Sequence, residues 1–221
     1  MKASKLTVEK TTAPKALPAM EGLAFGKHFS DHMLEVDWEP KGGWGAPRIK
    51  PYGNLSISPS AAVLHYAVEC FEGMKAYKDS AGKIRLFRPD CNVQRLNDSL
   101  DRLHLPRLDF GNFVKALGEL LKIDERWIPE GEGYSLYLRP TVIATDPYLG
   151  VGVANKVKMF VITCPVGPYY PTGFKPIKLL ADDVNVRAWP GGCGASKVLG
   201  GAHFHRPTMC VLGCAWRGLS R

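Results

Sequence analysis

Residues 134–145, YSLYLRPTVIAT, contain the alternation that decides the fold. Leu136 and Leu138 alternate with Tyr137 and Arg139, and successive side chains of a strand point to opposite faces. The pattern predicts a strand with one apolar face and one face that carries a tyrosine and an arginine. A proline follows the arginine, and proline in a strand indicates an edge or an irregularity. An arginine on such a face can bind a carboxylate or a phosphate, but it can equally form a surface ion pair.

Further strands are predicted on both sides of this segment in the sequence. The run KVKMFVITCPVG (156–167) predicts a second long strand, and DHMLEVDWE (31–39) predicts another. Two short alternating runs within MKAYKDSAGKIRLFR (74–88) predict a hairpin, while KGGWGAPRIKPYG (41–53) is typical of a loop rich in glycine and proline.

Three helices are predicted from apolar residues at helical spacing. The first would begin at Ser58, with Pro59 in its first turn, and end at Gly73. The apolar stripes of the three helices are Val63, Tyr66, Ala67, Cys70 and Phe71; Val93, Leu96, Leu100 and Leu103; and Phe113, Leu117, Leu120 and Leu121.

These elements predict an α+β fold made of a small N-terminal α/β domain and only the beginning of a larger one. Residues 1–22 are polar and carry no period, which indicates a loosely attached arm. The expected division that follows is a domain at 23–167, a linker at 168–173, the start of the large domain at 174–197, and a tail at 198–221.

Composition excludes several classes of function. The chain has 221 residues, 45% apolar and 23% charged, as in ordinary globular domains. The net charge of +8 comes from scattered lysines and arginines, which argues against nucleic-acid binding, and no apolar run is long enough to span a membrane. The N-terminus lacks the apolar core of a secretory signal, so we expect reduced thiols and a cytoplasmic protein. The spacing of the cysteines and histidines predicts no metal site.

Taken one at a time, the candidate chemical residues indicate little. Arg95 lies off the apolar stripe of the second helix, as a solvated residue would. Tyr66 and Phe71 lie on the stripe of the first helix, where packing is the simpler interpretation. Lys197 stands in RAWPGGCGASKVLGG (187–201), and a single lysine of this kind is ordinarily a surface residue. A buried lysine with a lowered pKa can form a Schiff base, but the sequence does not show burial.

Taken together, six segments resemble the branched-chain amino acid aminotransferases of the animal type, which are pyridoxal-phosphate enzymes of fold type IV. The resemblance covers residues from about 22 to Lys197. The segments are, in order, FGKHFSDHML (25–34), LHYAVECFEGMKAY (64–77), IRLFRPDCNVQRL (84–96), LYLRPTVIATDPYLGV (136–151), CPVGPYYPTG (164–173) and VRAWPGGCGASK (186–197).

The resemblance implies a cofactor, substrates and roles for individual residues. Lys197 matches the lysine that forms a Schiff base with pyridoxal 5'-phosphate and then moves the substrate proton. Arg95 matches the arginine that grips the cofactor phosphate. The substrate-binding residues implied are Phe25, Tyr66, Phe71, Tyr137, Arg139 and Val151. The family reaction transfers the amino group of leucine, isoleucine or valine to 2-oxoglutarate, and members form homodimers in the cytosol or the mitochondrial matrix.

The segment after Lys197, residues 198–221, does not resemble the family pattern. We therefore expect a chain truncated after the lysine, which would bind the cofactor weakly and not turn over. Two other functions stay open. One is a non-catalytic fragment that pairs with full-length subunits; the other is a different fold-type-IV enzyme, such as a D-amino-acid aminotransferase or an aminodeoxychorismate lyase.

Overall fold

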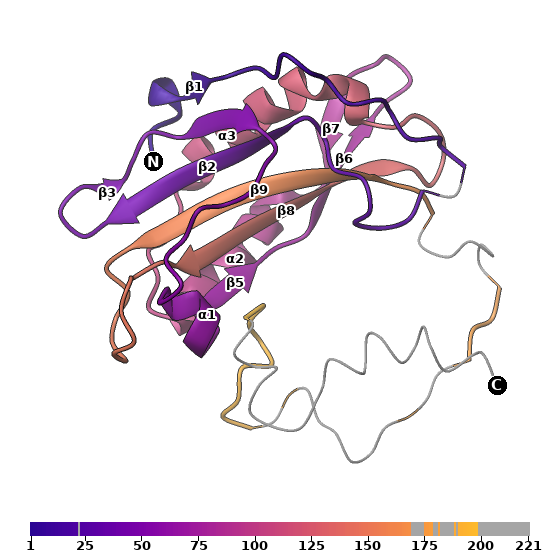
Figure 1. The fold of residues 1–221 in the computed structure, drawn as a ribbon. Helices are drawn as coiled ribbons and strands as arrows, with labels where there is room; N and C mark the ends of the chain where they lie inside the picture. Colours follow the sequence, from indigo (N-terminus) through magenta and orange to yellow (C-terminus); the bar gives the residue numbers. More distant parts are fainter. Residues whose placement is uncertain (22, 169–174, 179–180, 182–187, 189, 199–221) are drawn as a thin grey trace.

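A computed structural model describes residues 1–21, 23–168, 175–178, 181, 188 and 190–198 (Figure 1). Its strands form one sheet in the order β1-β4-β2-β9-β8-β6-β7, with β3 paired to β2 and β5 paired to β8. The strands are β1 Thr7–Val8, β2 His32–Glu39, β3 Gly43–Trp44, β4 Arg48–Pro51, β5 Glu69–Phe71, β6 Met74–Lys78, β7 Ile84–Leu86, β8 Ser135–Ala144 and β9 Val157–Val166. The α-helices are α1 Ala62–Tyr66, α2 Pro89–Arg102 and α3 Phe110–Ile123, and short 3-10 turns lie at Ala3–Lys5 and Glu125–Trp127. The expected α+β class is confirmed.

The two long strands β8 and β9 form the centre of the sheet. They are antiparallel and pair along their whole length, from Ser135 opposite Val166 to Ala144 opposite Val157. Leu136 and Leu138 are fully buried on one face of β8, as their alternation with Tyr137 predicts. The strands expected at 31–39 and 156–167 and the hairpin expected at 74–88 are also confirmed.

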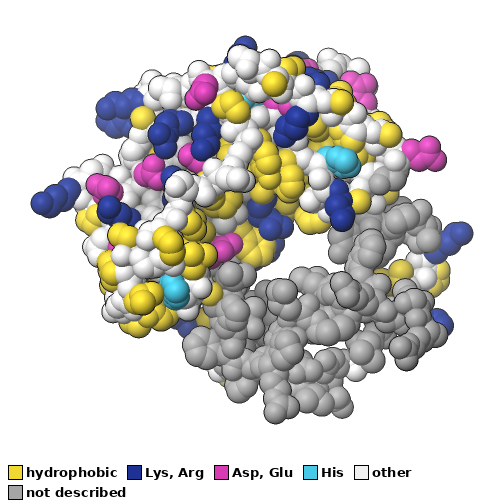
Figure 2. Space-filling model, in the orientation of Figure 1, with side chains coloured by type: hydrophobic (Ala, Val, Ile, Leu, Met, Phe, Trp, Pro, Cys, Tyr) yellow, Lys and Arg dark blue, Asp and Glu magenta, His cyan; other side chains and the backbone are white. Residues whose placement is uncertain are grey.

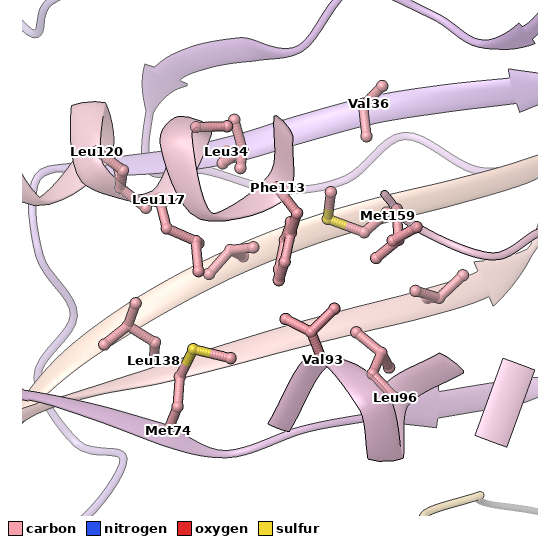
Figure 3. Close-up of a cluster of buried hydrophobic side chains, with 14 of the residues drawn as sticks. Leu34, Val36, Met74, Val93, Leu96, Phe113, Leu117, Leu120, Leu138 and Met159 are labelled. Atoms are coloured by element: carbon pink, nitrogen blue, oxygen red, sulfur yellow. The ribbon is translucent and has the colours of Figure 1, made fainter. Parts of the chain in front are cut away.

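Both long helices lie on the same side of the sheet, behind it in Figure 1. Their apolar stripes pack onto the sheet face that carries Leu34 of β2, Leu138 of β8 and Met159 of β9, and this contact forms the core (Figure 3). The stripes predicted for α2 and α3 are confirmed, since Leu96, Leu100, Phe113 and Leu117 have no exposed surface. Helix α3 begins where Asp109 accepts a hydrogen bond from the amide of Asn112 at 2.8 Å, which satisfies a free N–H of the first turn.

Strands β5 and β6 pair with β8 in one continuous register. Phe71 stands opposite Thr141 and Met74 opposite Leu138, so the interruption between the two strands falls opposite Arg139 and Pro140. Proline has no N–H to donate to a neighbouring strand. The irregularity expected at the proline is therefore real, and it lies in the middle of the sheet rather than at its edge.

The first predicted helix is largely wrong. Only Ala62–Tyr66 is helical, Ala67 adopts a left-handed conformation at φ 52°, and the chain then continues as β5. The expected N-cap Ser58 makes its hydrogen bond to Ser60 instead, outside the helix. In β5 the side chain of Cys70 is buried, whereas those of Glu69 and Phe71 on either side are half-buried, as in a strand. The residues expected to form the last helical turn therefore pair with β8 instead. Tertiary pairing outweighs the local helical period here.

The N-terminal arm and the loop at 41–53 are more ordered than expected. The loop supplies β3 and β4, and β1 from the arm pairs in parallel with β4. The backbone N–H of Lys15 donates to the Asp31 carboxylate at 2.9 Å, and that of Thr11 donates to the His32 ring at 2.9 Å. The expectation of a loosely attached arm is wrong because backbone donors of the arm meet buried acceptors.

Most of the expected later divisions lie outside the described residues. This holds for nearly all of the linker at 168–173 and the tail at 198–221, and for much of 174–197. Within the described part, no helix has both the length and the apolar content needed to cross a membrane.

Replacing Leu138 tests the core. Leu138→Ala removes a fully buried side chain between β8 and the helices, so we expect the free energy of unfolding to fall by about 2–5 kcal/mol. Leu64→Ala is the control, because Leu64 is 58% exposed and should change stability by no more than about 0.5 kcal/mol. Urea unfolding followed by circular dichroism measures both, and equal losses would contradict this description of the core.

Candidate active site

The sheet face opposite the helices carries a cluster of aromatic rings and cations. The centre of the Arg139 guanidinium lies 4.6 Å from the centroid of the Phe71 ring and 5.3 Å from that of Tyr137. Its Nε donates to the Tyr137 hydroxyl at 3.0 Å. Figure 2 shows hydrophobic side chains gathered over the middle of this face, with Lys and Arg side chains around them. A ring face attracts a cation, so these contacts fix where the guanidinium lies.

Phe25 and Gly73 complete the surroundings of Tyr137. The Phe25 ring meets the Tyr137 ring edge-on, with centroids 4.9 Å apart, although 61% of Phe25 is exposed. A Cβ atom on Gly73 would overlap the Tyr137 hydroxyl. A larger residue at position 73 would therefore displace the end of the Tyr137 side chain.

Lys197 reaches the same cluster from the other end of the described chain. Its Nζ lies 5.2 Å from the Phe71 ring centroid, so Lys197 and Arg139 both lie against this ring. Its main chain is held on both sides: the N–H donates to Ser99 Oγ at 2.9 Å, and the carbonyl accepts from the Phe71 N–H at 3.1 Å. Lys197 is half-buried.

Arg95 on α2 forms an ion pair with Glu72. Two guanidinium nitrogens contact the carboxylate, Nε to Oε1 and Nη2 to Oε2, the latter at 2.8 Å. Glu72 is completely buried and also accepts from Asn92 Nδ2 at 2.9 Å and from the Gly73 N–H at 3.0 Å. Burial opposes ionisation of Glu72, but these hydrogen bonds outweigh it and hold its pKa below the ordinary value. Arg95 is 48% exposed, so part of its guanidinium can face a ligand.

Two predicted residues lie elsewhere. Tyr66 ends α1 and donates its hydroxyl to the Leu149 carbonyl. Together with Val151, which is 88% exposed, it lines a pocket near Ala144 at the end of β8. Ala144 lies about 10 Å along β8 from Thr141, the partner of Phe71, and about 23 Å from Tyr137. The structure therefore groups Phe25, Phe71, Tyr137, Arg139 and Lys197, and it places Tyr66 and Val151 at a second location.

Sequence reasoning missed several residues that shape this site. Glu72 and Ser99 hold Arg95 and Lys197, and Gly73 accommodates Tyr137. Glu69 lies on the same face of β5 as Phe71, and burial raises its pKa despite the opposing charge of Arg139. A glutamate between apolar residues in CFEG was the available signal, since a charge seldom lies inside a core without a partner.

No group of three or more histidine, cysteine, aspartate or glutamate side chains within the described residues is placed to hold a metal ion. Cys70 is buried next to the site, and burial, followed by the nearby charges of Glu69 and Glu72, raises the pKa of its thiol to about 12. Cys70 therefore stays a neutral packing residue at physiological pH.

Comparison with known proteins finds close relatives. The chain is 55% identical over 219 residues to a branched-chain-amino-acid aminotransferase of Dictyostelium discoideum, covering 99% of this chain and 57% of the relative. It is 50% identical to the cytosolic enzyme of that name from Saccharomyces cerevisiae, covering 98% of this chain and 57% of the relative. No protein-family model matches. One solved structure that resembles the chain is a branched-chain amino acid aminotransferase of Escherichia coli, with 17% identity and a TM-score of 0.49, covering 77% of this chain and 52% of that one.

The chain thus spans about half the length of the curated relatives that it matches. A coverage of 99% leaves only a few residues unmatched, so the alignment with the Dictyostelium relative extends into the tail that we expected to depart from the family pattern.

Removing Arg95 should destabilise the chain through Glu72. Arg95→Ala leaves a fully buried carboxylate without its cation, and we expect the free energy of unfolding to fall by about 2–4 kcal/mol. Adding Glu72→Gln to this variant removes the charge and should recover about half of the loss. A double-mutant cycle in urea measures the coupling between the two residues, and purely additive losses would count against the pair.

The same pair predicts acid sensitivity. The pKa of Glu72 is lower in the folded state than its ordinary value of 4.5, so the folded state favours the ionised carboxylate. Its contribution is complete above about pH 4.5 and is lost as the pH falls through the lower folded pKa. We expect the stability difference between the original chain and Glu72→Gln to shrink across this interval. Unfolding curves between pH 7 and pH 3 measure it, and a constant difference would contradict the assignment.

Proposed function

We propose that this chain supplies the part of a transaminase active site that carries the reactive lysine. It is related to the branched-chain-amino-acid aminotransferases over about half of their length. The reaction would move the amino group of leucine, isoleucine or valine to 2-oxoglutarate. The observation that carries the proposal is that the Lys197 amino group and the Arg139 guanidinium lie against one ring, Phe71, at 5.2 and 4.6 Å. A nucleophilic amine is thereby placed close to a cation that can bind a carboxylate.

The residues present fit pyridoxal phosphate at two points. Lys197 would hold its aldehyde carbon, and the exposed part of Arg95 would face its phosphate. Because Glu72 already fixes two of the guanidinium nitrogens, Arg95 is oriented before any anion arrives. When bound, pyridoxal phosphate supplies an aldehyde that accepts the amino group and a conjugated ring that accepts the electron pair.

The substrate pocket would combine apolar rings with one cation. Phe25, Phe71 and Tyr137 present aromatic surface that suits a branched aliphatic side chain and excludes water. The second substrate, 2-oxoglutarate, is acidic at both ends, so the same pocket must also accept a carboxylate. Arg139, bonded to the Tyr137 hydroxyl, is the donor best placed for that role.

Lys197 is proposed to move the proton in this reaction. Its amino group would take the proton from the substrate Cα as a base and return it as an acid. For this role the amine must be neutral in part of the cycle. No protein residue besides Lys197 is assigned to this step.

Assembly and location are also proposals. The relatives include cytosolic and mitochondrial enzymes, and we propose the cytoplasm for this protein. We further propose that it works as a homodimer, and the apolar residues around Val151 are a surface on which a second copy could lie.

Borohydride trapping tests the proposal. The purified 221-residue chain is mixed with pyridoxal phosphate and reduced, and the modified lysines are mapped by mass spectrometry. We expect the label to concentrate on Lys197, because ring and main-chain contacts hold its amine inside the site. The variant Lys197→Ala controls for adventitious labelling of surface lysines. Label spread evenly over many lysines of the original chain would count against the site.

Turnover is a separate prediction. We expect the 221 residues on their own to form glutamate from L-leucine and 2-oxoglutarate no faster than free cofactor does, since they span about half of a relative's length. A rate above that background which disappears in Lys197→Ala would overturn this expectation. Activity with D-alanine but not with L-leucine would instead favour a D-amino-acid aminotransferase.

A further inference from the structure

Ser99 occupies an unusual position between the helix and the lysine. It lies on α2, one turn after Arg95, and is completely buried. Its Oγ donates to the Arg95 carbonyl at 3.0 Å and accepts from the Lys197 N–H at 2.9 Å. The hydroxyl thus uses its donor within the helix and its acceptor on a segment that lies 98 residues later in the chain.

The second side of the Lys197 main chain is held by β5. Its carbonyl accepts from the Phe71 N–H at 3.1 Å, and Val198 forms a bridge with Cys70. Two bonds to two different elements fix the Cα of Lys197 and the direction in which its side chain leaves. That direction places Nζ over the Phe71 ring.

Helix α2 therefore fixes the position of Arg95 relative to Lys197, the two residues that we propose to contact the cofactor. Arg95 is oriented by Glu72, which follows Phe71 directly in the sequence, and Ser99 connects the next turn of the same helix to Lys197. A shift of Lys197 relative to Arg95 would break the Ser99 hydrogen bond, the Phe71 hydrogen bond, or both.

We propose that Ser99 is a positioning residue, which holds the main chain of Lys197 so that the amine reaches the site. The inference rests on the proposed function, since it concerns the same lysine. Alanine at position 99 would leave the Lys197 N–H without its acceptor, whereas threonine would keep a hydroxyl that both donates and accepts.

The experiment compares Ser99→Ala and Ser99→Thr with the original chain in two measurements. Hydrogen exchange measures protection of the Lys197 amide, and reductive trapping with pyridoxal phosphate measures the share of label on Lys197. We expect Ser99→Ala to lower the protection about tenfold and the share of label about threefold, and Ser99→Thr to restore most of both.

Ser135→Ala is the matched control. Ser135 is also a completely buried serine, but its Oγ meets no hydrogen-bond partner among the described residues. This variant should leave both measurements unchanged, which separates the loss of any buried hydroxyl from the loss of this acceptor. If Ser99→Ala does not fold, the comparison is made between Ser99→Thr and Ser99→Val, which differ in the hydroxyl and hardly in shape.

The outcomes separate the inference from the function beneath it. Selective labelling of Lys197 in the original chain, with protection and labelling unchanged in Ser99→Ala or Ser99→Val, would overturn the role of Ser99 and leave the proposed function standing. Absence of selective labelling in the original chain would overturn the proposed function, and the inference with it. Loss of both signals in the variants that lack the hydroxyl, with recovery in Ser99→Thr, would support the inference.

Discussion

The missing N–H of Pro140 is the constraint on which the site depends. Because β5 and β6 share one register against β8, an ordinary residue at position 140 could have joined them into a single strand. Instead the pairing is interrupted at Glu72 and Gly73. The Glu72 N–H still bonds to the Pro140 carbonyl at 2.9 Å, while the Gly73 carbonyl accepts from Asn92 of α2 at 3.1 Å. Helix α2 thereby completes hydrogen bonding that the sheet leaves open.

This interruption connects the two faces of the sheet. The leucine face of β8 packs against α2 and α3, and the opposite face carries Tyr137 and Arg139. Glu72 and Gly73 lie where the faces meet: the carboxylate binds Arg95 of the helix, and the space above the glycine is filled by the tyrosine. A single irregularity thus supports both the cation of the helix and the rings of the open face.

Much of the fold could be predicted because its signals are local. The stripes of α2 and α3 and the alternation at Leu136 and Tyr137 follow from one period each. The first helix was wrong because Cys70 and Phe71 satisfy a helical spacing and a strand alternation equally well. Only the pairing with β8 decides between the two, and that pairing joins residues about seventy positions apart.

The candidate site shows the same limit. Tyr137 and Arg139 could be placed on one face from the sequence, and the family resemblance pointed to Lys197 and Arg95. The segment CFEG indicates that Glu72 needs a partner, but nothing local identifies that partner as Arg95 or indicates that Ser99 meets Lys197, because these contacts span 23 and 98 positions. Tyr66 and Val151 line a pocket that does not include Phe71, and the single lining that the resemblance implies for all three stays a prediction.

The close approach of Tyr137 to Gly73 has a consequence for how this protein can vary. Any side chain at position 73 would place a Cβ atom where the phenol of Tyr137 lies, so the phenol and the guanidinium bonded to its hydroxyl would both have to shift. Substitutions at residue 73 would therefore change the shape of the pocket, although glycine itself has no side chain that could contact a ligand. A survey that scored positions only by the side chains they present would leave this one out.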